Sequence, residues 1–190
     1  MLDCACGRGK WGYLTRIWLD HQRRDAYIVG CDAWLPHLCF CKSHKTYDDE
    51  IRCDVRWLPF RGSSADVTVA CEVIEHLPRE EGFRSIHEME RVTKLRLIVS
   101  TPNGLWPQKA SPDDALETHQ SSWSTRDLQE LGFKVVGVGP PPLARSRVIR
   151  ILATKRLASL FARLFIAVAS SISPSLPRLG TLLVAWKDRR

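Results

Sequence analysis

The feature that most constrains the fold is a glycine pattern near the start of the chain, Gly7-x-Gly9-x-x-Gly12. A short apolar stretch precedes it, and residues 13–19 carry apolar side chains at helical spacing. A strand that leads through a glycine turn into a helix lets a small ligand lie against the backbone, because glycine has no Cβ in the way. Asp32, 20 residues after Gly12, stands where an acid would bind a ribose hydroxyl. The pattern alone is a dinucleotide fingerprint, and its surroundings have to decide which nucleotide it holds.

Asp3 narrows the choice of ligand. It lies inside the predicted strand, four positions before Gly7, and is expected to direct a carboxylate toward the ligand end of the loop. A pyrophosphate would be repelled there, whereas a ligand with an ammonium and a sulfonium would be attracted. S-adenosylmethionine has these charges and also carries the ribose that suits Asp32. Arg8 and Lys10 would suit a phosphate, but loop side chains of that length can turn toward solvent.

Strand-like runs alternate with helical patterns along the rest of the chain. This alternation predicts a mostly parallel sheet that is covered by helices on both faces, with right-handed crossovers. A polar loop over 105–123 is expected to lie over the ligand end of the sheet. Strands are expected at 26–32, 51–54, 65–72, 95–101, 133–138 and 181–186, and helices at 35–45, 79–94 and 124–131.

Four features fall at the carboxyl ends of predicted strands, namely the glycine turn, Asp32, Asp54 and Glu72. Open α/β sheets bind their ligands at this edge, near the point where the strand order reverses. A single acid after a strand is often only a helix cap. Four such features in successive units predict one shared binding site.

In the order and spacing of these motifs, the chain resembles the class I S-adenosylmethionine-dependent methyltransferases with small-molecule and lipid substrates. The resemblance covers residues 1 to about 139. It implies an α/β, Rossmann-like class I methyltransferase fold with a mostly parallel twisted sheet and helices on both faces. It also implies transfer of a methyl group to a small-molecule or lipid-like acceptor. The segments that carry it are Leu2-Asp-Cys-Ala-Cys-Gly-Arg-Gly9, Val29-Gly-Cys-Asp32, Cys53-Asp54 with Leu58-Pro-Phe60, Glu72-Val-Ile-Glu-His-Leu77, and, more weakly, Ser100-Thr-Pro-Asn103, Asp127-Leu128 and Gly132-Phe133.

The same resemblance implies which residues would hold the methionine part of the cofactor. Asp3, Gly7 and Gly9 would line its methionine end. Cys71 and Glu72 would close that side through backbone and side chain.

For the nucleoside part, the resemblance implies that Asp32 would hold the ribose hydroxyls and that Ala33 would pack beside them. Asp54 would accept a hydrogen bond from the adenine amino group, and the backbone N–H of Val55 would donate one.

Two departures from the family's pattern stand out. Ala5 occupies a position in the cofactor loop where the family usually has glycine, which tightens the loop by one methyl group. The chain also begins inside the first strand, whereas the family normally has a helix before it. We therefore expect either a truncated N-terminus or cover from the C-terminal segment.

Methyl transfer is an in-line displacement, and alignment of the reactants alone can lower its barrier by roughly 7–11 kcal/mol. A general base is needed only if the acceptor must lose a proton. His76 is the best placed candidate, with Glu75 beside it and His119 in the loop over the site. The alternative for His76 is a structural hydrogen bond at the start of a helix.

His37, Cys39, Cys41 and His44 crowd into one short stretch, but their spacing differs from the usual C-x(2–4)-C of zinc sites. No metal site is predicted. The seven cysteines are an odd number, and most lie in apolar runs, so we expect reduced thiols in a cytoplasmic protein.

The net charge of +7 is concentrated near the C-terminus, because residues 141–190 contain 10 Lys/Arg and one acid. One domain is expected over 1–190, with a cofactor-binding core at 1–139 and a basic, apolar C-terminal helix and last strand at 140–190. The amphipathic segment 148–172 suits either an ordinary helix that covers the sheet or peripheral membrane contact. Nucleic acid ranks lowest as a partner, because the basic region lacks aromatics suited to base stacking.

Two other functions stay open at this point. An NAD-dependent oxidoreductase would share the glycine pattern but would leave Asp3 and Asp54 unexplained. A truncated, membrane-associated module without catalysis would have lost cofactor binding.

Overall fold

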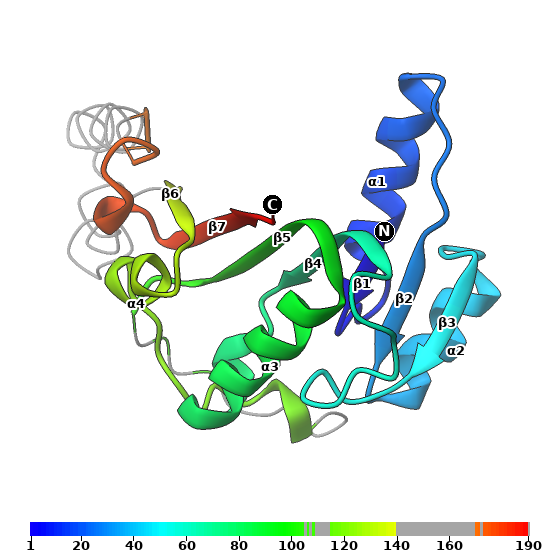
Figure 1. The fold of residues 1–190 in the computed structure, drawn as a ribbon, viewed down its shortest axis with the longest axis horizontal. Coiled ribbons are helices and arrows are strands. Elements are labelled where there is room, and N and C mark those ends of the chain that lie inside the picture. The colour runs from blue at the N-terminus through cyan, green and yellow to red at the C-terminus, as the bar shows by residue number, and fades with distance from the viewer. Residues whose placement is uncertain (105, 107, 109–114, 140–169, 172, 190) are drawn as a thin grey trace, which may run out of the picture. The chain divides into compact units, whose positions relative to one another are not determined.

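The structure is a computed structural model that describes residues 1–104, 106, 108, 115–139, 170, 171 and 173–189 (Figure 1). The described residues form one seven-stranded sheet with the strand order β3-β2-β1-β4-β5-β7-β6. This confirms the predicted α/β fold. The strands are β1 Leu2–Cys4, β2 Val29–Asp32, β3 Asp49–Arg52, β4 Ala65–Cys71, β5 Thr93–Pro102, β6 Lys134–Val138 and β7 Leu182–Asp188. The helices are α1 Lys10–His21, α2 Leu35–Ser43, α3 Arg79–Val92 and α4 Thr125–Glu130, with 3-10 turns η1 Ile74–His76, η2 Ala115–Glu117 and η4 Pro177–Leu179.

The parallel pairing of the first four strands brings their carboxyl ends to one edge. β1 pairs with both β2 and β4, and β2 pairs with β3, all in parallel. Asp3 stands opposite Gly30 on one side and Val69 on the other. The strand order reverses between β1 and β4, which is where open α/β sheets bind their ligands.

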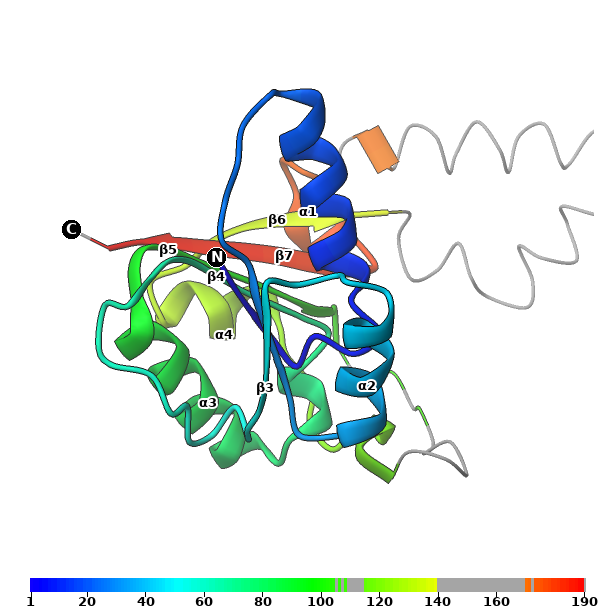
Figure 2. The ribbon, with the colours of Figure 1, turned by 90° about the vertical axis from the view of Figure 1, so that its right-hand side faces the viewer.

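Helices cover both sides of these strands. Figure 2 shows α3 on one side of β1–β4 and α1 with α2 on the other. Ile86, Met89 and Val92 are buried on α3, at the helical spacing predicted from the sequence. Cover on both faces is consistent with the complete burial of the three residues of β1.

The chain groups into two compact units. The first comprises Met1–Val99, Pro107–Ser121 and Trp186–Arg190, and the second comprises Ser100–Trp106 and Ser122–Ala185. All predicted cofactor residues lie in the first unit. The domain boundaries expected from the sequence stay a prediction.

Two local features organise the described part of the second unit. Ser124 caps α4 by accepting a hydrogen bond from the Asp127 N–H while the Asp127 carboxylate accepts from the Ser124 N–H, which is a capping box. The amide of Asn103 donates to the carbonyl of Gly180 at 2.8 Å, which ties the end of β5 to the chain before β7.

Most of the amphipathic segment 148–172 lies outside the described residues. Among the helices that the structure does describe, none has both the length and the apolar character that crossing a bilayer requires.

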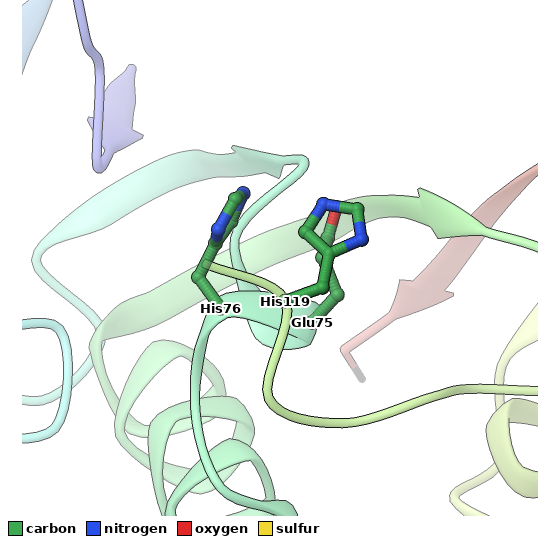
Figure 3. A group of neighbouring side chains, drawn as sticks. All are labelled: Glu75, His76 and His119. Atoms are coloured by element: carbon green, nitrogen blue, oxygen red, sulfur yellow. The ribbon is translucent and has the colours of Figure 1, made fainter. Parts of the chain in front are cut away.

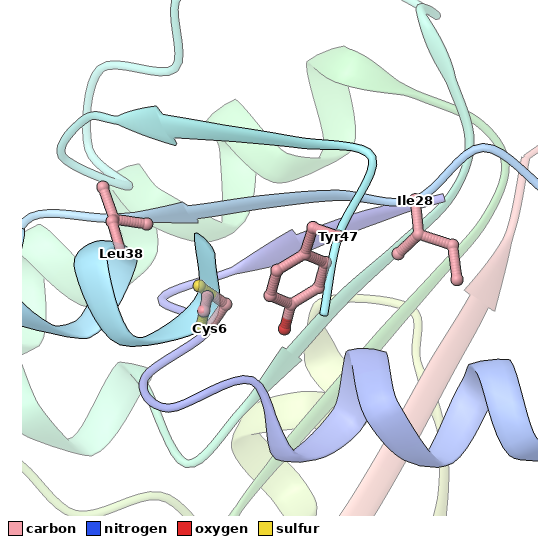
Figure 4. Close-up of a cluster of buried hydrophobic side chains, with 5 residues drawn as sticks. Cys6, Ile28, Leu38 and Tyr47 are labelled. Atoms are coloured by element: carbon pink, nitrogen blue, oxygen red, sulfur yellow. The ribbon is translucent and has the colours of Figure 1, made fainter. Parts of the chain in front are cut away.

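A small buried cluster lies around the first two strands. Its members are Cys6, Ile28, Leu38, Cys41 and Tyr47, and Figure 4 shows four of them labelled. α2 packs on β2 and β3, which places Leu38 and Cys41 in this cluster. Cys6 belongs to this cluster and immediately precedes Gly7, so the cluster anchors the start of the glycine turn.

Candidate functional site

Gly7 and Gly12 of the glycine pattern have different surroundings. Gly7 and Gly9 have positive φ values of 53° and 79°, which glycine adopts without strain. A Cβ added at Gly7 would meet no atom of the described residues within 4 Å, its two chain neighbours aside, so a ligand can approach this backbone. A Cβ at Gly12 would lie 2.2 Å from Tyr47 Cε1. Gly12 therefore serves packing, and Gly7 is the position where a ligand can approach.

Asp32 ties this turn to the second strand. Its Oδ2 accepts a hydrogen bond from the Gly7 N–H, and its Oδ1 accepts one from the Trp34 N–H, both at 2.8 Å. His37 Nδ1 lies 3.5 Å from Oδ1. Each carboxylate oxygen has two acceptor sites, so these contacts leave capacity for further donors. The sequence predicted Asp32 at this edge but not its bond to the turn.

Asp3 is buried, with 1% of its surface exposed, and the Tyr47 hydroxyl donates a 2.6 Å hydrogen bond to its Oδ2. Burial raises the pKa of Asp3 to about 6, and the hydrogen bond from Tyr47 opposes that rise. Sequence reasoning missed Tyr47. Gly30 is the residue in the sequence that could have indicated a large neighbour here. It stands directly opposite Asp3, and a Cβ at Gly30 would lie 2.6 Å from Tyr47 Cδ2.

Asp54 lies in an ion pair that the sequence did not predict. The Arg56 guanidinium donates to both carboxylate oxygens, with Nη2 at 2.5 Å from Oδ2, and also reaches Glu81 at 3.4 Å. This pairing lowers the pKa of the Asp54 carboxyl. Val55, beside it, is buried. Any adenine amino group at Asp54 would share the carboxylate with Arg56.

The remaining predicted cofactor residues also lie at the carboxyl edge of the strands. Cys71 ends β4 and is half-buried, and Glu72 follows it, exposed, with a φ of 59°. Ala33 follows β2 and is exposed. Ala5 has a φ of 53°, a left-handed conformation that glycine adopts without strain.

Glu75, His76 and His119 form a cluster beyond the end of β4. Figure 3 shows the three side chains pointing in the same direction from the η1 turn and from the loop that carries His119. The two imidazole rings meet edge to face, with centroids 4.8 Å apart. Glu75 is 2% exposed. Burial, with His119 close by, lowers the pKa of His76.

In the stretch of histidines and cysteines on α2, the two cysteines have different surroundings. Cys39 is exposed, whereas Cys41 is buried and its thiol donates to the carbonyl of Gly7 at 3.3 Å. The two thiols therefore point to different surroundings, as expected for Cys-x-Cys on a helix. All seven cysteines are free thiols.

Comparison with known proteins places the chain among methyltransferases. Residues 2–96 match the model of the family described as a methyltransferase domain. No curated protein matches the chain in sequence at a significant level.

Solved structures resemble the fold at low sequence identity. An S-adenosylmethionine-dependent methyltransferase from Archaeoglobus fulgidus matches with a TM-score of 0.60 and 13% identity, covering 99% of this chain and 85% of its own. A possible histamine N-methyltransferase from Thermotoga maritima gives 0.60 and 13%, covering 100% and 81%. Magnesium protoporphyrin IX methyltransferase from Synechocystis, with S-adenosylhomocysteine bound, gives 0.56 and 15%, covering 100% and 73%.

Proposed function

Because the chain belongs to the methyltransferase domain family, whose cofactor is S-adenosylmethionine, we propose that it transfers the methyl group to a small-molecule or lipid-like acceptor. The family match decides against the NAD-dependent oxidoreductase, which shares only the glycine pattern. The module without catalysis predicts no cofactor binding, and the titration described below separates it from an enzyme.

The observation that carries the cofactor assignment is the open backbone at Gly7 between two acids. A Cβ at Gly7 would meet no atom of the described residues within 4 Å, its chain neighbours aside, and the Gly7 N–H donates to Asp32. Asp3 lies four residues earlier, beneath Tyr47. A cofactor with a cationic amino acid part and a ribose fits this arrangement, because it needs close backbone approach and nearby carboxylates but no phosphate site.

Each predicted residue has a distinct proposed function at this site. Asp3, Ala5, Gly7 and Gly9 form the methionine side, and Asp3 supplies negative charge there once ionised. Cys71 and Glu72 close that side from the end of β4.

On the nucleoside side, Asp32 uses its remaining acceptor capacity for the ribose hydroxyls, and Ala33 packs beside them. Asp54 accepts from the adenine amino group and Val55 donates its backbone N–H. Arg56 keeps the Asp54 carboxylate ionised and fixed in orientation, because it donates to both oxygens.

When bound, the cofactor supplies an already activated methyl group. The chain then has to align the acceptor and exclude water, and this alignment is the larger part of catalysis. His76 is the proposed general base for an acceptor that must lose a proton, with Glu75 and His119 around it.

Two of the structural neighbours have names that refer to small molecules, histamine and magnesium protoporphyrin IX. By this analogy a small-molecule acceptor is proposed. Peripheral membrane contact through 148–172 is part of the proposal for a lipid-like acceptor. It rests on the sequence pattern alone, as does the cytoplasmic location.

Calorimetric titration with S-adenosylhomocysteine and with NAD⁺ tests the cofactor site. Asp32→Asn should weaken S-adenosylhomocysteine binding by about 10-fold or more, since removing a partner of a charge-assisted hydrogen bond costs about 1.5–3 kcal/mol. The matched control is Asp66→Asn, an acid whose side chain is 65% exposed and paired with Lys94. Equal affinities of wild type and Asp32→Asn, or binding of NAD⁺ alone, would contradict the assignment.

A thermal melt gives an independent measure of the same binding. A ligand at 100 times its dissociation constant adds about 2.7 kcal/mol of stability. For a chain of this size that corresponds to a rise in melting temperature of roughly 5–11 °C.

The acceptor class is tested by supplying methyl-labelled S-adenosylmethionine with separated cell fractions of metabolites, lipids, RNA and protein. We expect label in the metabolite or lipid fraction. Label confined to RNA or protein would overturn the acceptor class while leaving the cofactor assignment intact. Pelleting with anionic vesicles, with and without residues 148–172, tests the membrane contact.

A further inference from the structure

The cluster at η1 has the composition of a transition-metal site. Glu75, His76 and His119 each offer one ligand atom, and these atoms all lie within 4.8 Å of one another. Zinc bonds to histidine nitrogen and carboxylate oxygen are about 2.0–2.2 Å long, so the ligand atoms of a tetrahedral ion stand about 3.4 Å apart. Figure 3 shows how the three side chains lie, and binding of an ion would bring their ligand atoms to this spacing.

Burial at this cluster favours binding of a cation. The Glu75 side chain is almost fully buried, and a bound cation offsets the cost of an ionised carboxylate in such surroundings. The Nδ1 atom of His76 is also buried, and it has no hydrogen-bond partner within the described part of the chain. An ion coordinated through this nitrogen would satisfy a buried polar atom.

The backbone holds the two parts of the cluster together. The N–H groups of Gln120 and Ser121 donate to the carbonyl of Glu75 at 2.8 and 3.1 Å. The side chain of Gln120 donates to the His76 carbonyl at 2.7 Å, and the Ser121 hydroxyl donates to the Ile74 carbonyl at 3.1 Å. These four bonds fix the residues next to His119 against the turn that carries the other two ligands, although the segments are 44 residues apart in sequence. Preorganised ligands bind metal more tightly, because less order is lost on binding.

We propose that Glu75, His76 and His119 bind one Zn²⁺ ion. Two imidazoles and one carboxylate are the three protein ligands of one class of catalytic zinc site, in which water or substrate takes the fourth position. Magnesium and calcium favour oxygen-only sets, so two imidazoles select against them. The site is distinct from the stretch of cysteines and histidines on α2.

This inference does not depend on the acceptor or on cofactor binding. It changes the function of His76, because an imidazole nitrogen that coordinates the ion cannot accept a proton from the acceptor. Coordination and general-base catalysis are therefore alternative functions of His76, and metal binding separates them.

The test uses the full chain after removal of metal with a chelator. Co²⁺, which replaces Zn²⁺ in most such sites, gives visible absorption bands whose intensity reports a tetrahedral site, and Zn²⁺ should displace it. We expect one Zn²⁺ per chain by calorimetry. Thiolate ligands give additional near-ultraviolet bands with Co²⁺, so binding to cysteines is distinguished from binding at this site.

His119→Ala removes a ligand that lies on a loop, so this variant is expected to fold. Its Zn²⁺ affinity should fall by more than the 10–100-fold that loss of an outer partner typically costs. Glu75→Gln keeps the shape of a buried side chain and should show a similar loss. Gln120→Ala keeps all three ligands but removes the side-chain bond to His76, and we expect a decrease of about 10-fold.

His87→Ala is the matched control, since His87 is an exposed histidine on α3 that lies next to Glu90. Its Zn²⁺ affinity should equal that of wild type. Wild-type protein that binds no Zn²⁺ overturns the proposal, and so does unchanged affinity in His119→Ala. Titration of the same samples with S-adenosylhomocysteine shows whether a failure concerns the metal site alone or the methyltransferase assignment as well.

Discussion

Tyr47 covers the buried Asp3 carboxylate and donates a 2.6 Å hydrogen bond to it. The same ring packs on Gly12 of α1 and on Gly30 of β2, where any Cβ would lie under 3 Å from its atoms. One side chain from the segment between α2 and β3 thus joins the first helix, the second strand and the acid of the first strand. It links packing to the charge at the proposed methionine side of the cofactor site.

The pH dependence of stability should report the ionisation of the Asp3 carboxyl group. Its pKa is about 6 in the folded protein and about 3.8 unfolded, so the folded state holds the proton more tightly. Its contribution to the free energy of unfolding is therefore largest below pH 4 and decreases as the pH rises to about 6. The total loss is about 3 kcal/mol. Asp3→Asn lacks this loss, so its stability relative to wild type should rise by that amount between pH 4 and pH 7 in urea unfolding. A difference that does not change with pH would contradict the shifted pKa.

Cofactor affinity should change in the opposite direction. S-adenosylmethionine binding should strengthen as the pH rises through 6, because ionised Asp3 attracts its cationic groups. Asp3→Asn should bind more weakly at pH 7.5 and should lack this pH dependence in calorimetric titrations between pH 5 and 8. Unchanged binding by this variant would remove Asp3 from the cofactor site.

Tyr47→Phe removes only the hydroxyl. The ring still packs on Gly12 and Gly30, but the Asp3 carboxylate loses its donor, so the pKa of Asp3 should rise further. We expect the free energy of unfolding, measured in urea, to fall by about 1.5–3 kcal/mol at pH 7.5, the typical value for a hydrogen bond to a charged group. The loss should be smaller at pH 4.5, where Asp3 is protonated. Equal losses at both values would show that the hydroxyl acts through packing alone.

Gly30→Ala should destabilise the protein because its Cβ would lie 2.6 Å from the Tyr47 ring. Overpacking of this kind costs about 1–3 kcal/mol, measured by thermal or urea unfolding. Gly62→Ala is the control, since the nearest atom to its Cβ is 3.5 Å away. Similar stability of the two variants would mean that Tyr47 is not fixed where the structure places it.

Ala5→Gly should stabilise the protein by about 1 kcal/mol. Ala5 has a φ of 53°, a conformation that costs a residue with a Cβ about 1–2 kcal/mol and costs glycine almost nothing. The gain is reduced by the greater entropy of glycine in the unfolded chain. Ala65→Gly at the start of β4, where φ is not positive, should instead lower the melting temperature. A lower melting temperature for Ala5→Gly would contradict the strain.

Much of the fold and part of the site follow from local sequence patterns. The glycine turn, the apolar runs and the acids at the strand ends are short-range features, and parallel pairing brings Asp32 and the end of β4 to one edge whatever the details of packing. Element ends moved by only a few residues, as in β3, which was predicted at 51–54 and lies at Asp49–Arg52. Such shifts reflect hydrogen-bond pairing with β2, which residue pattern alone does not encode.

What the sequence by itself determined is therefore the class of fold, the family and the edge of the sheet where the proposed cofactor site lies. Tertiary structure decided the partners of the charged groups: Asp3 with Tyr47, Asp54 with Arg56, and Glu75 and His76 with His119. In the first and third cases the partners are about 44 residues apart in sequence. The physical reason is that the pKa of a carboxylate and the ligands of an ion depend on burial and on distances of a few Å. Those quantities arise only when distant segments pack together.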